Sequence, residues 1–191
     1  MGDAQKDRDQ AARLPEGDVV AILLGQHARI KELFGDVKTA QGERKQKAFD
    51  ELRALLAVHE TAEEVVVRPV TKDTAGKAQA DARNEEEAEA NKVLARLEKM
   101  DVHSVEFDAR FAEFERAVLE HAEHEEREEF PALRAGRTEE QLQKMGDRLR
   151  AVETLAPTHP HPVAAGKPMV QALTGPFASM VDRARDMLSR T

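Results

Sequence analysis

Apolar residues recur every three or four positions along most of this chain, which is the spacing of one face of an amphipathic α-helix. Short polar stretches and Gly or Pro residues separate the periodic segments. The sequence therefore predicts an all-α fold. The predicted helices cover residues from about 18 to 38, 44 to 71, 77 to 100, 104 to 133, 139 to 153 and 176 to 188.

The first four predicted helices are long and have short connections, which is typical of an up-down-up-down four-helix bundle. We assign residues 18–135 to this bundle. Residues 1–17 are polar and end in a Pro-Glu-Gly turn, so they are predicted to be a disordered leader. Residues 136–191 hold additional C-terminal helices joined by a Pro/His linker at 157–162. We interpret the last, amphipathic helix as a strap on the bundle or an element that binds a partner protein.

The apolar face of the fourth predicted helix leads into two polar residues. Its core positions step by four, three and four residues through Phe107, Phe111, Phe114 and Val118. The same stepping then reaches His121 and Glu125. Burying an imidazole or a carboxylate without a partner costs several kcal/mol. Because residues four apart on a helix face the same way, both side chains can reach one point, where a metal ion would make their burial favourable.

The second predicted helix repeats this arrangement with His59 and Glu63, again four residues apart on the apolar face. In the first helix His27 occupies the same stripe as the core residues. The third helix carries no histidine, but either Glu86 or Glu87 occupies its inward position. A run of acidic residues is also typical of a solvated helix face, so these carboxylates are either ligands or surface groups.

In antiparallel packing these residues fall at the same depth of the bundle and form one layer. Three imidazoles and three carboxylates are too many ligands for one tetrahedral zinc ion. They suit two octahedral ions bridged by carboxylates and an oxo or hydroxo group, and a nitrogen and oxygen ligand set without thiolate favours iron or manganese. His124, one turn after His121, is a spare ligand, a hydrogen-bond partner of the site or a solvated residue.

Composition and charge narrow the function. The formal net charge is −8, which argues against nucleic acid as a partner. No Cys is present, so disulfides, thiolate metal sites and Cys nucleophiles are excluded. No run of about 18 apolar residues could span a membrane, and Met1–Gln10 lacks the apolar core of a secretory signal. The expected location is therefore the cytoplasm.

Three of the predicted helices carry one ordered pattern of metal-ligand residues. It consists of His27, His59-x-x-x-Glu63 and His121-x-x-x-Glu125-Glu126 before Phe130-Pro131. This pattern resembles the hemerythrin-like (HHE cation-binding) family over about residues 18 to 135. The resemblance implies a four-helix bundle with two non-haem iron ions, in which His27, His59 and His121 are terminal ligands. Glu63 and Glu125 would bridge the two irons, and Glu126 is the alternative to Glu125.

The chain departs from the family on the third helix, where Glu87, with Glu86 beside it, stands in place of a histidine. A carboxylate there adds a negative charge, which favours the ferric state and lowers the reduction potential. Reversible oxygen transport needs a stable diferrous form, so we expect a centre that reacts with or senses O2, peroxide or nitric oxide. Such a centre is either an enzyme, for example one that decomposes peroxide, or a sensor. The alternatives are an iron store or buffer and a metal-free helical interaction module.

Overall fold

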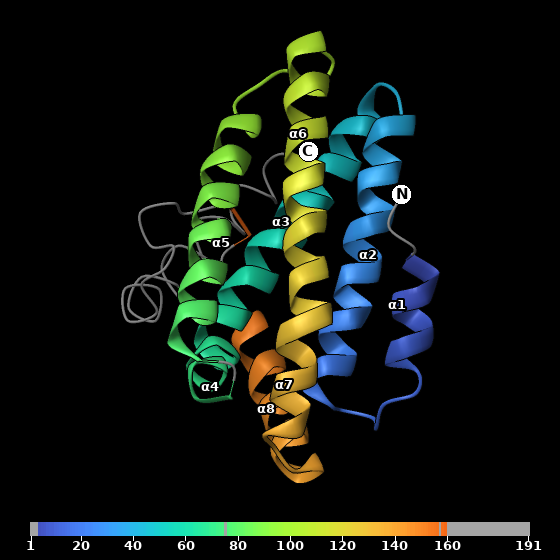
Figure 1. Cartoon of the computed structure of the whole chain (residues 1–191). Helices are drawn as coiled ribbons and strands as arrows, with labels where there is room; N and C mark the ends of the chain where they lie inside the picture. Colours follow the sequence, from blue (N-terminus) through green and yellow to red (C-terminus); the bar gives the residue numbers. More distant parts are fainter. Residues whose placement is uncertain (1–3, 75, 157, 160–191) are drawn as a thin grey trace.

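The computed structural model describes residues 4–74, 76–156 and 158–159 (Figure 1). Its elements are α1 Ala4–Ala11, α2 Val19–Thr39, α3 Glu43–Val66, α4 Arg68–Thr74, α5 Lys77–Leu97, α6 Val105–His124, the π-helical turn η1 Glu125–Glu129, α7 Phe130–Ala135 and α8 Glu139–Glu153. These described residues contain no strand, so the predicted all-α fold is confirmed. Within the same ranges, each helix is too short or too polar to cross a lipid bilayer.

Four long helices, α2, α3, α5 and α6, run alternately up and down and form the predicted bundle (Figure 1). Helix α7 continues the line of α6, and α8 packs against α2 and α3. Side chains cap the starts of α2, α6 and α8. Asp18 and Ser104 accept hydrogen bonds of 2.8 and 3.1 Å from backbone N–H groups in the first turns of α2 and α6. Thr138 and Gln141 form a capping box at the start of α8, which therefore begins where the sequence predicts.

Two of the predicted helices are not continuous. The second is predicted to extend to residue 71, but α3 ends at Val66 and α4 begins at Arg68. Pro69 has no backbone N–H to donate to a carbonyl of the preceding turn, so the hydrogen-bond ladder of α3 is interrupted here. The fourth predicted helix consists of α6, η1 and α7. In η1 the backbone hydrogen bonds span five residues, which inserts one extra residue into the turn.

The leader is helical rather than disordered in its described part. Helix α1 packs against α2 (Figure 1), and the buried Asp7 carboxylate accepts a hydrogen bond of 2.5 Å from Lys31 Nζ. Arg8 pairs with Glu32 on the same side of α2. An ion pair across 24 residues of sequence orders a segment whose composition alone favours disorder. The predicted helix at 176–188 and most of the Pro/His linker lie outside the described residues.

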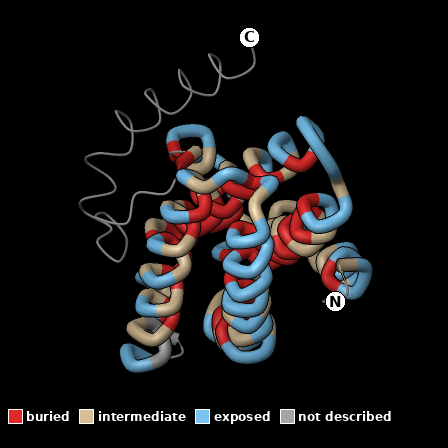
Figure 2. The backbone as a smooth tube through the Cα atoms, turned by 90° about the horizontal axis from the view of Figure 1, so that it is seen from above, coloured by how far each residue is buried: buried red, intermediate tan, exposed pale blue. Residues whose placement is uncertain are grey.

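The buried positions of the bundle helices face its inside, whereas the exposed positions face outward (Figure 2). The buried apolar side chains form two clusters. The aromatic cluster contains Ile30, Leu33, Phe34, Val37, Phe49, Leu52, Leu56, Leu94, Leu97, Val102, Phe107, Phe111, Phe114 and Val118. The α8 cluster contains Val19, Val20, Leu23, Leu24, Ala62, Val66, Val67, Phe130, Leu133, Leu142, Met145 and Leu149. Along α2, α3 and α6 the residues between the two clusters include His27, His59 and His121. A polar layer therefore separates the two halves of the core.

Gly146 in α8 lies against the loop that precedes α2. A Cβ atom at this position would collide with the backbone oxygen of Gly17 and touch the Ile22 side chain. We expect Gly146→Ala to lower the free energy of unfolding, measured in urea, by about 1–3 kcal/mol, which is the usual cost of overpacking. Gly35→Ala is the matched control because an added Cβ meets nothing within 4 Å there, and it should be neutral or stabilise by up to about 1 kcal/mol. Equal free energies of unfolding of the two variants would contradict the expected collision between a Cβ atom at position 146 and the backbone of Gly17.

Candidate metal centre

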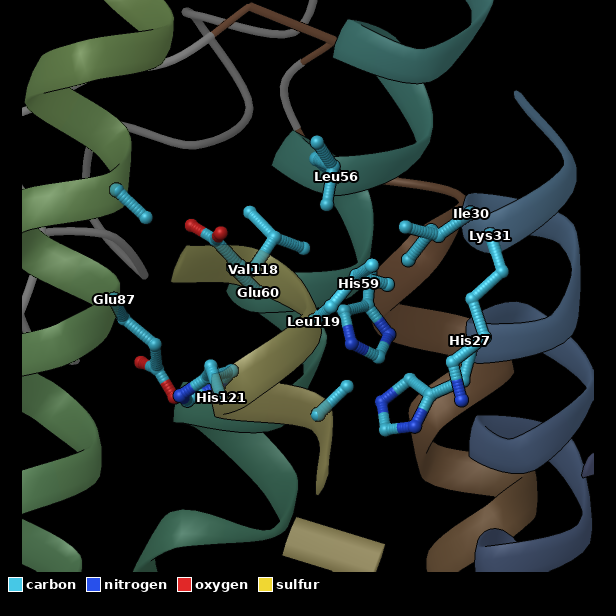
Figure 3. A pocket seen from close by; sticks show the side chains of 12 residues that line it. His27, Ile30, Lys31, Leu56, His59, Glu60, Glu87, Val118, Leu119 and His121 are labelled. Atoms are coloured by element: carbon cyan, nitrogen blue, oxygen red, sulfur yellow. The ribbon is translucent and has the colours of Figure 1, made fainter. Parts of the chain in front are cut away.

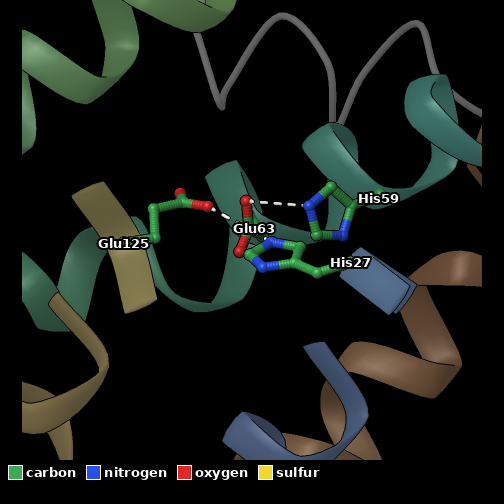
Figure 4. A group of neighbouring side chains, drawn as sticks. All are labelled: His27, His59, Glu63 and Glu125. Atoms are coloured by element: carbon green, nitrogen blue, oxygen red, sulfur yellow. Dashed lines mark ion pairs between the residues drawn. The ribbon is translucent and has the colours of Figure 1, made fainter. Parts of the chain in front are cut away.

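Histidine and glutamate side chains from α2, α3, α5, α6 and η1 meet in the polar layer. They form two groups in which one ligand atom from each residue lies within 4.8 Å of all the others. The first group consists of His27, His59, Glu63 and Glu125 (Figure 4), and the second of Glu63, Glu87, His121 and Glu125. Glu63 and Glu125 belong to both groups. The cluster therefore offers two neighbouring candidate cation positions with two carboxylates in common.

The first position is formed by α2, α3 and η1 (Figure 4). His27 Nε2 lies 3.5 Å from Glu125 Oε2, and His59 Nε2 lies 3.5 Å from Glu63 Oε2. His59 and Glu63 face the same point because they are one turn apart on α3. The rings of His27 and His59 meet edge to face with their centroids 5.1 Å apart, so the two imidazoles approach this position from adjoining directions.

The second position is formed by α3, α5, α6 and η1. His121 Nε2 lies 3.2 Å from Glu125 Oε1 and 3.8 Å from Glu87 Oε1. The two oxygens of Glu125 thus face different positions, Oε2 toward His27 and Oε1 toward His121. A carboxylate divided in this way can bind two cations at once.

The π-helical turn η1 carries two inward carboxylates at the end of the α6 line. Glu125 is its first residue and Glu129 its last, and their exposed fractions are 0% and 1%. Turns of this type occur frequently at functional sites, since the extra residue changes which side chains face inward. Phe130 follows directly and returns the chain to the α8 cluster, where its ring stacks on that of His27 with the centroids 5.5 Å apart.

All three histidines present the same ring nitrogen to the site. Their Nδ1 atoms contact side-chain oxygens outside the two groups, at 2.9, 2.7 and 2.8 Å for the pairs His27–Glu126, His59–Gln26 and His121–Glu86. The Nε2 atoms are left to face the shared carboxylates. Outer hydrogen bonds of this kind fix the tautomer and the orientation of histidines that bind metals.

Several buried polar atoms of the cluster have no hydrogen-bond partner in the part of the chain that the structure describes. They are Nε2 of His27, Nε2 of His121, both oxygens of Glu63, Oε2 of Glu87 and Oε2 of Glu125. Buried polar atoms are nearly always satisfied, and an exception needs a physical reason. Binding of cations supplies one, because these nitrogen and oxygen atoms converge on the two positions. The residues present therefore fit metal cations that accept a mixed imidazole and carboxylate ligand set.

Burial and charge set the protonation of the cluster. Burial lowers the pKa of His59 to about 3, and the nearby His27 acts in the same direction, so the His59 imidazole is neutral and can serve as a ligand. Burial also lowers the pKa of His121, but the surrounding carboxylates, Glu125 first, outweigh it and raise this pKa well above its usual value. Burial and the charge of Glu125 raise the pKa of Glu63 well above its usual value. The cluster thus has an excess of buried carboxylates that a cation would stabilise.

Arg68 lies beside these carboxylates, and the sequence does not predict it as a residue of the site. It is the first residue of α4 and is 1% exposed. Its guanidinium pairs with Glu87, Glu125 and Glu129. In the sequence, Arg68 precedes a proline at the predicted end of a helix, where a solvated basic residue is ordinary. The sequence feature that could have indicated a buried arginine is the surplus of inward-facing carboxylates, because buried negative charges need a positive partner.

A small cavity adjoins the cluster on the side of the aromatic cluster (Figure 3). Its volume is about 20 Å³, enough for about one water-sized molecule. Its apolar wall is formed by Ile30, Leu56, Ala90, Val118, Leu119 and Ala122. Its polar side is formed by His27, Lys31, His59, Glu60, Glu87 and His121. The cavity suits a small ligand next to the two positions.

The remaining candidate residues surround the two groups. Glu86 is not a member of either group, and its Oε1 lies 3.4 Å from His124 Nδ1. The His124 side chain is 25% exposed, so it is neither part of the groups nor fully solvated. Glu126, the alternative to Glu125 in the sequence, also lies outside both groups, where it pairs with His27 and with Lys31 at 3.0 Å. In the structure, Glu87 and Glu125 are members of the ligand groups, and Glu86 and Glu126 are not.

Fold and site together define a class of protein, a four-helix bundle whose polar layer gathers His and Glu side chains around cation positions. The sequence profile of the hemerythrin HHE cation-binding domain matches residues 18–133. The chain therefore belongs to the hemerythrin HHE cation-binding domain family, and the resemblance noted in the sequence is confirmed.

Individual relatives agree with this membership. An uncharacterised hemerythrin-like protein of Schizosaccharomyces pombe (strain 972) is 28% identical over 138 residues, which are 71% of this chain and 68% of the relative. A crystal structure of a hemerythrin HHE cation-binding domain-containing protein from Mycobacterium kansasii matches with a TM-score of 0.64 at 21% identity. The match covers 88% of this chain and 98% of the other. At this identity the likeness supports the fold.

Proposed function

We propose that this protein binds two non-haem iron ions in the polar layer and uses them to react with or sense O2, peroxide or nitric oxide. The proposal rests mainly on the two ligand groups that share Glu63 and Glu125. One ion would be held by the two histidines of the first group together with the shared carboxylates. The other would be held by Glu87 and His121 with the same carboxylates.

Bound iron would supply the redox chemistry, since the chain has no Cys, Tyr or Trp that could take part in electron transfer. The residues of the chain supply position and environment. The outer hydrogen bonds hold the three imidazoles in place, and the apolar wall of the adjoining cavity limits the ligand to a small molecule. In place of a neutral imidazole, Glu87 adds a negative charge to the ligands of the second position, and Arg68, which pairs with it, offsets part of that charge. The carboxylate favours the ferric state and thereby oxidation chemistry over reversible oxygen transport.

Iron content and an absorption spectrum test the proposal. Protein loaded anaerobically with Fe²⁺ and then desalted should hold about two irons per chain, as two mixed nitrogen and oxygen sites require, and should develop near-ultraviolet charge-transfer absorption in air. We expect His121→Ala to lose the second ion and this absorption. His103→Ala is the matched control, because His103 lies exposed in the turn before α6, and it should keep both. Loaded wild-type protein without iron or this absorption would overturn the proposal in favour of a helical interaction module.

Peroxide turnover separates the functions within the proposal. Many molecules of peroxide consumed per iron would define an enzyme, whereas a spectral change without turnover would define a sensor. Iron retained without either property would define a store. We expect reaction or sensing, because the described cluster has only two cation positions, which is a small capacity for storage.

A further inference from the structure

The guanidinium of Arg68 contacts carboxylate oxygens that face the second of the two cation positions. Its Nη2 pairs with Glu87 Oε1 and, at 3.2 Å, with Glu125 Oε1. These are the same two oxygens that face His121 Nε2 at 3.8 and 3.2 Å. Arg68 therefore contacts ligand atoms of the second group. At the first position the contacts to Glu125 Oε2 and Glu63 Oε2 come from His27 and His59.

The two positions consequently differ in charge. An arginine keeps its positive charge at all accessible pH values, and burial makes that charge dependent on its carboxylate partners. An ion entering the second position would meet this charge and compete with it for Glu87 and Glu125. An ion entering the first position would bind two imidazoles and the oxygens of Glu63 and Glu125 that Arg68 does not contact.

Glu129 offers the guanidinium another partner. It is buried, lies outside both ligand groups, and pairs with Arg68 Nη1 at 2.6 Å. Thr71, also buried and one turn along α4, donates a hydrogen bond to its other oxygen. The carboxylate is thus fixed in a place where it can hold Arg68 after the contacts to Glu87 and Glu125 are given up.

We propose that Arg68 acts as a built-in cation of the second position and makes the affinity of this position for a metal ion lower than that of the first. This inference rests on the proposed function, because it concerns the same two positions. In the unloaded protein the guanidinium neutralises the carboxylates of the second group. The first ion binds at His27 and His59, and the second ion binds more weakly because it must shift Arg68 toward Glu129.

Calorimetric titration of the unloaded, full-length protein tests this, with Co²⁺ or anaerobic Fe²⁺ as the titrant. We expect wild-type protein to show two binding steps of different affinity. Arg68→Gln should strengthen the second step at least about tenfold, since it removes a positive charge beside the bound ion, and should bring the two steps closer together. Arg53→Gln is the matched control, because Arg53 is also buried but pairs with Glu98 and His159 away from the site. It should leave both steps as in the wild type.

Glu129→Gln gives a second test that keeps Arg68 in the chain. Without this carboxylate the guanidinium should hold Glu87 and Glu125 more tightly, so the second step should weaken while the first changes little. A second step that is unchanged or weaker in Arg68→Gln, or equal weakening of both steps in Glu129→Gln, would overturn the inference while the two-ion function stands. Wild-type protein that binds no metal would overturn the proposed function and this inference with it.

Discussion

Glu125→Gln should abolish binding of the second metal ion and weaken binding of the first by more than about 100-fold, beyond the usual loss caused by removing an outer hydrogen-bond partner. Glu125 belongs to both ligand groups, and its two oxygens face His27 and His121 separately. The amide keeps the size of the side chain but removes the charge and one of the two acceptor oxygens. Metal content after desalting, followed by calorimetric titration, would measure the loss at each position.

Glu126→Gln is the appropriate control for this experiment. Glu126 is the next residue, carries the same functional group and contacts Nδ1 of His27 from outside the cluster. We expect it to lower the affinity of the first position by about 10–100-fold, the range for outer partners of metal ligands, and to leave the second position unchanged. If Glu126→Gln removed both ions and Glu125→Gln kept them, the acidic ligand would be Glu126 and the placement of Glu125 would be wrong.

The sequence predicts most of the cluster because the relevant information is local. His59 and Glu63 lie one turn apart on the apolar face of one helix, and His121 and Glu125 do so on another. Helical periodicity alone places such pairs toward the core. His27 follows from the same rule, since it continues the stripe of core residues in its own helix. The structure brings all five of these residues together.

The choice between Glu86 and Glu87 cannot be made from periodicity in the same way. Neighbouring residues on a helix point about 100° apart, and a face defined by few apolar residues does not fix the rotation that closely. Packing of α5 against α6 decides it. Glu87 is 2% exposed and faces the second position, whereas Glu86 lies at the side of the bundle and bonds to Nδ1 of His121.

Arg68 and the helical leader depend on contacts between distant segments. The burial of Arg68 requires the break between α3 and α4 and carboxylates that arrive 19 to 61 residues later. Helix α1 is held by the pair between Asp7 and Lys31, and Lys31 in turn contacts Glu126 beside the cluster. Neither the composition nor the local periodicity of the sequence indicates which residues from distant segments form ion pairs. A count of inward charges along the predicted helices would have indicated that a buried cation was needed near the carboxylates.

The position of the polar layer predicts that stability and metal binding can be altered separately. Phe111 lies in the aromatic cluster, 2% exposed, with its ring centroid 5.3 Å from that of Phe34 and 5.3 Å from that of Phe107. It precedes His121 by ten residues in α6, a distance of roughly 15 Å along the helix. Sites separated by more than about 10 Å without shared partners generally behave independently.

We therefore expect Phe111→Ala to lower the free energy of unfolding of the unloaded protein by about 3–5 kcal/mol, the usual cost of a large cavity in a core. The folded fraction of the variant, prepared at low temperature, should still bind two metal ions with wild-type affinities. Urea unfolding and calorimetric titration measure the two quantities, and Val105→Ala is the control because Val105 is 85% exposed. Loss of metal from folded Phe111→Ala protein would show that the aromatic cluster holds the ligands in place. Retention of both ions would show that the ligands are held within the polar layer by their outer hydrogen bonds.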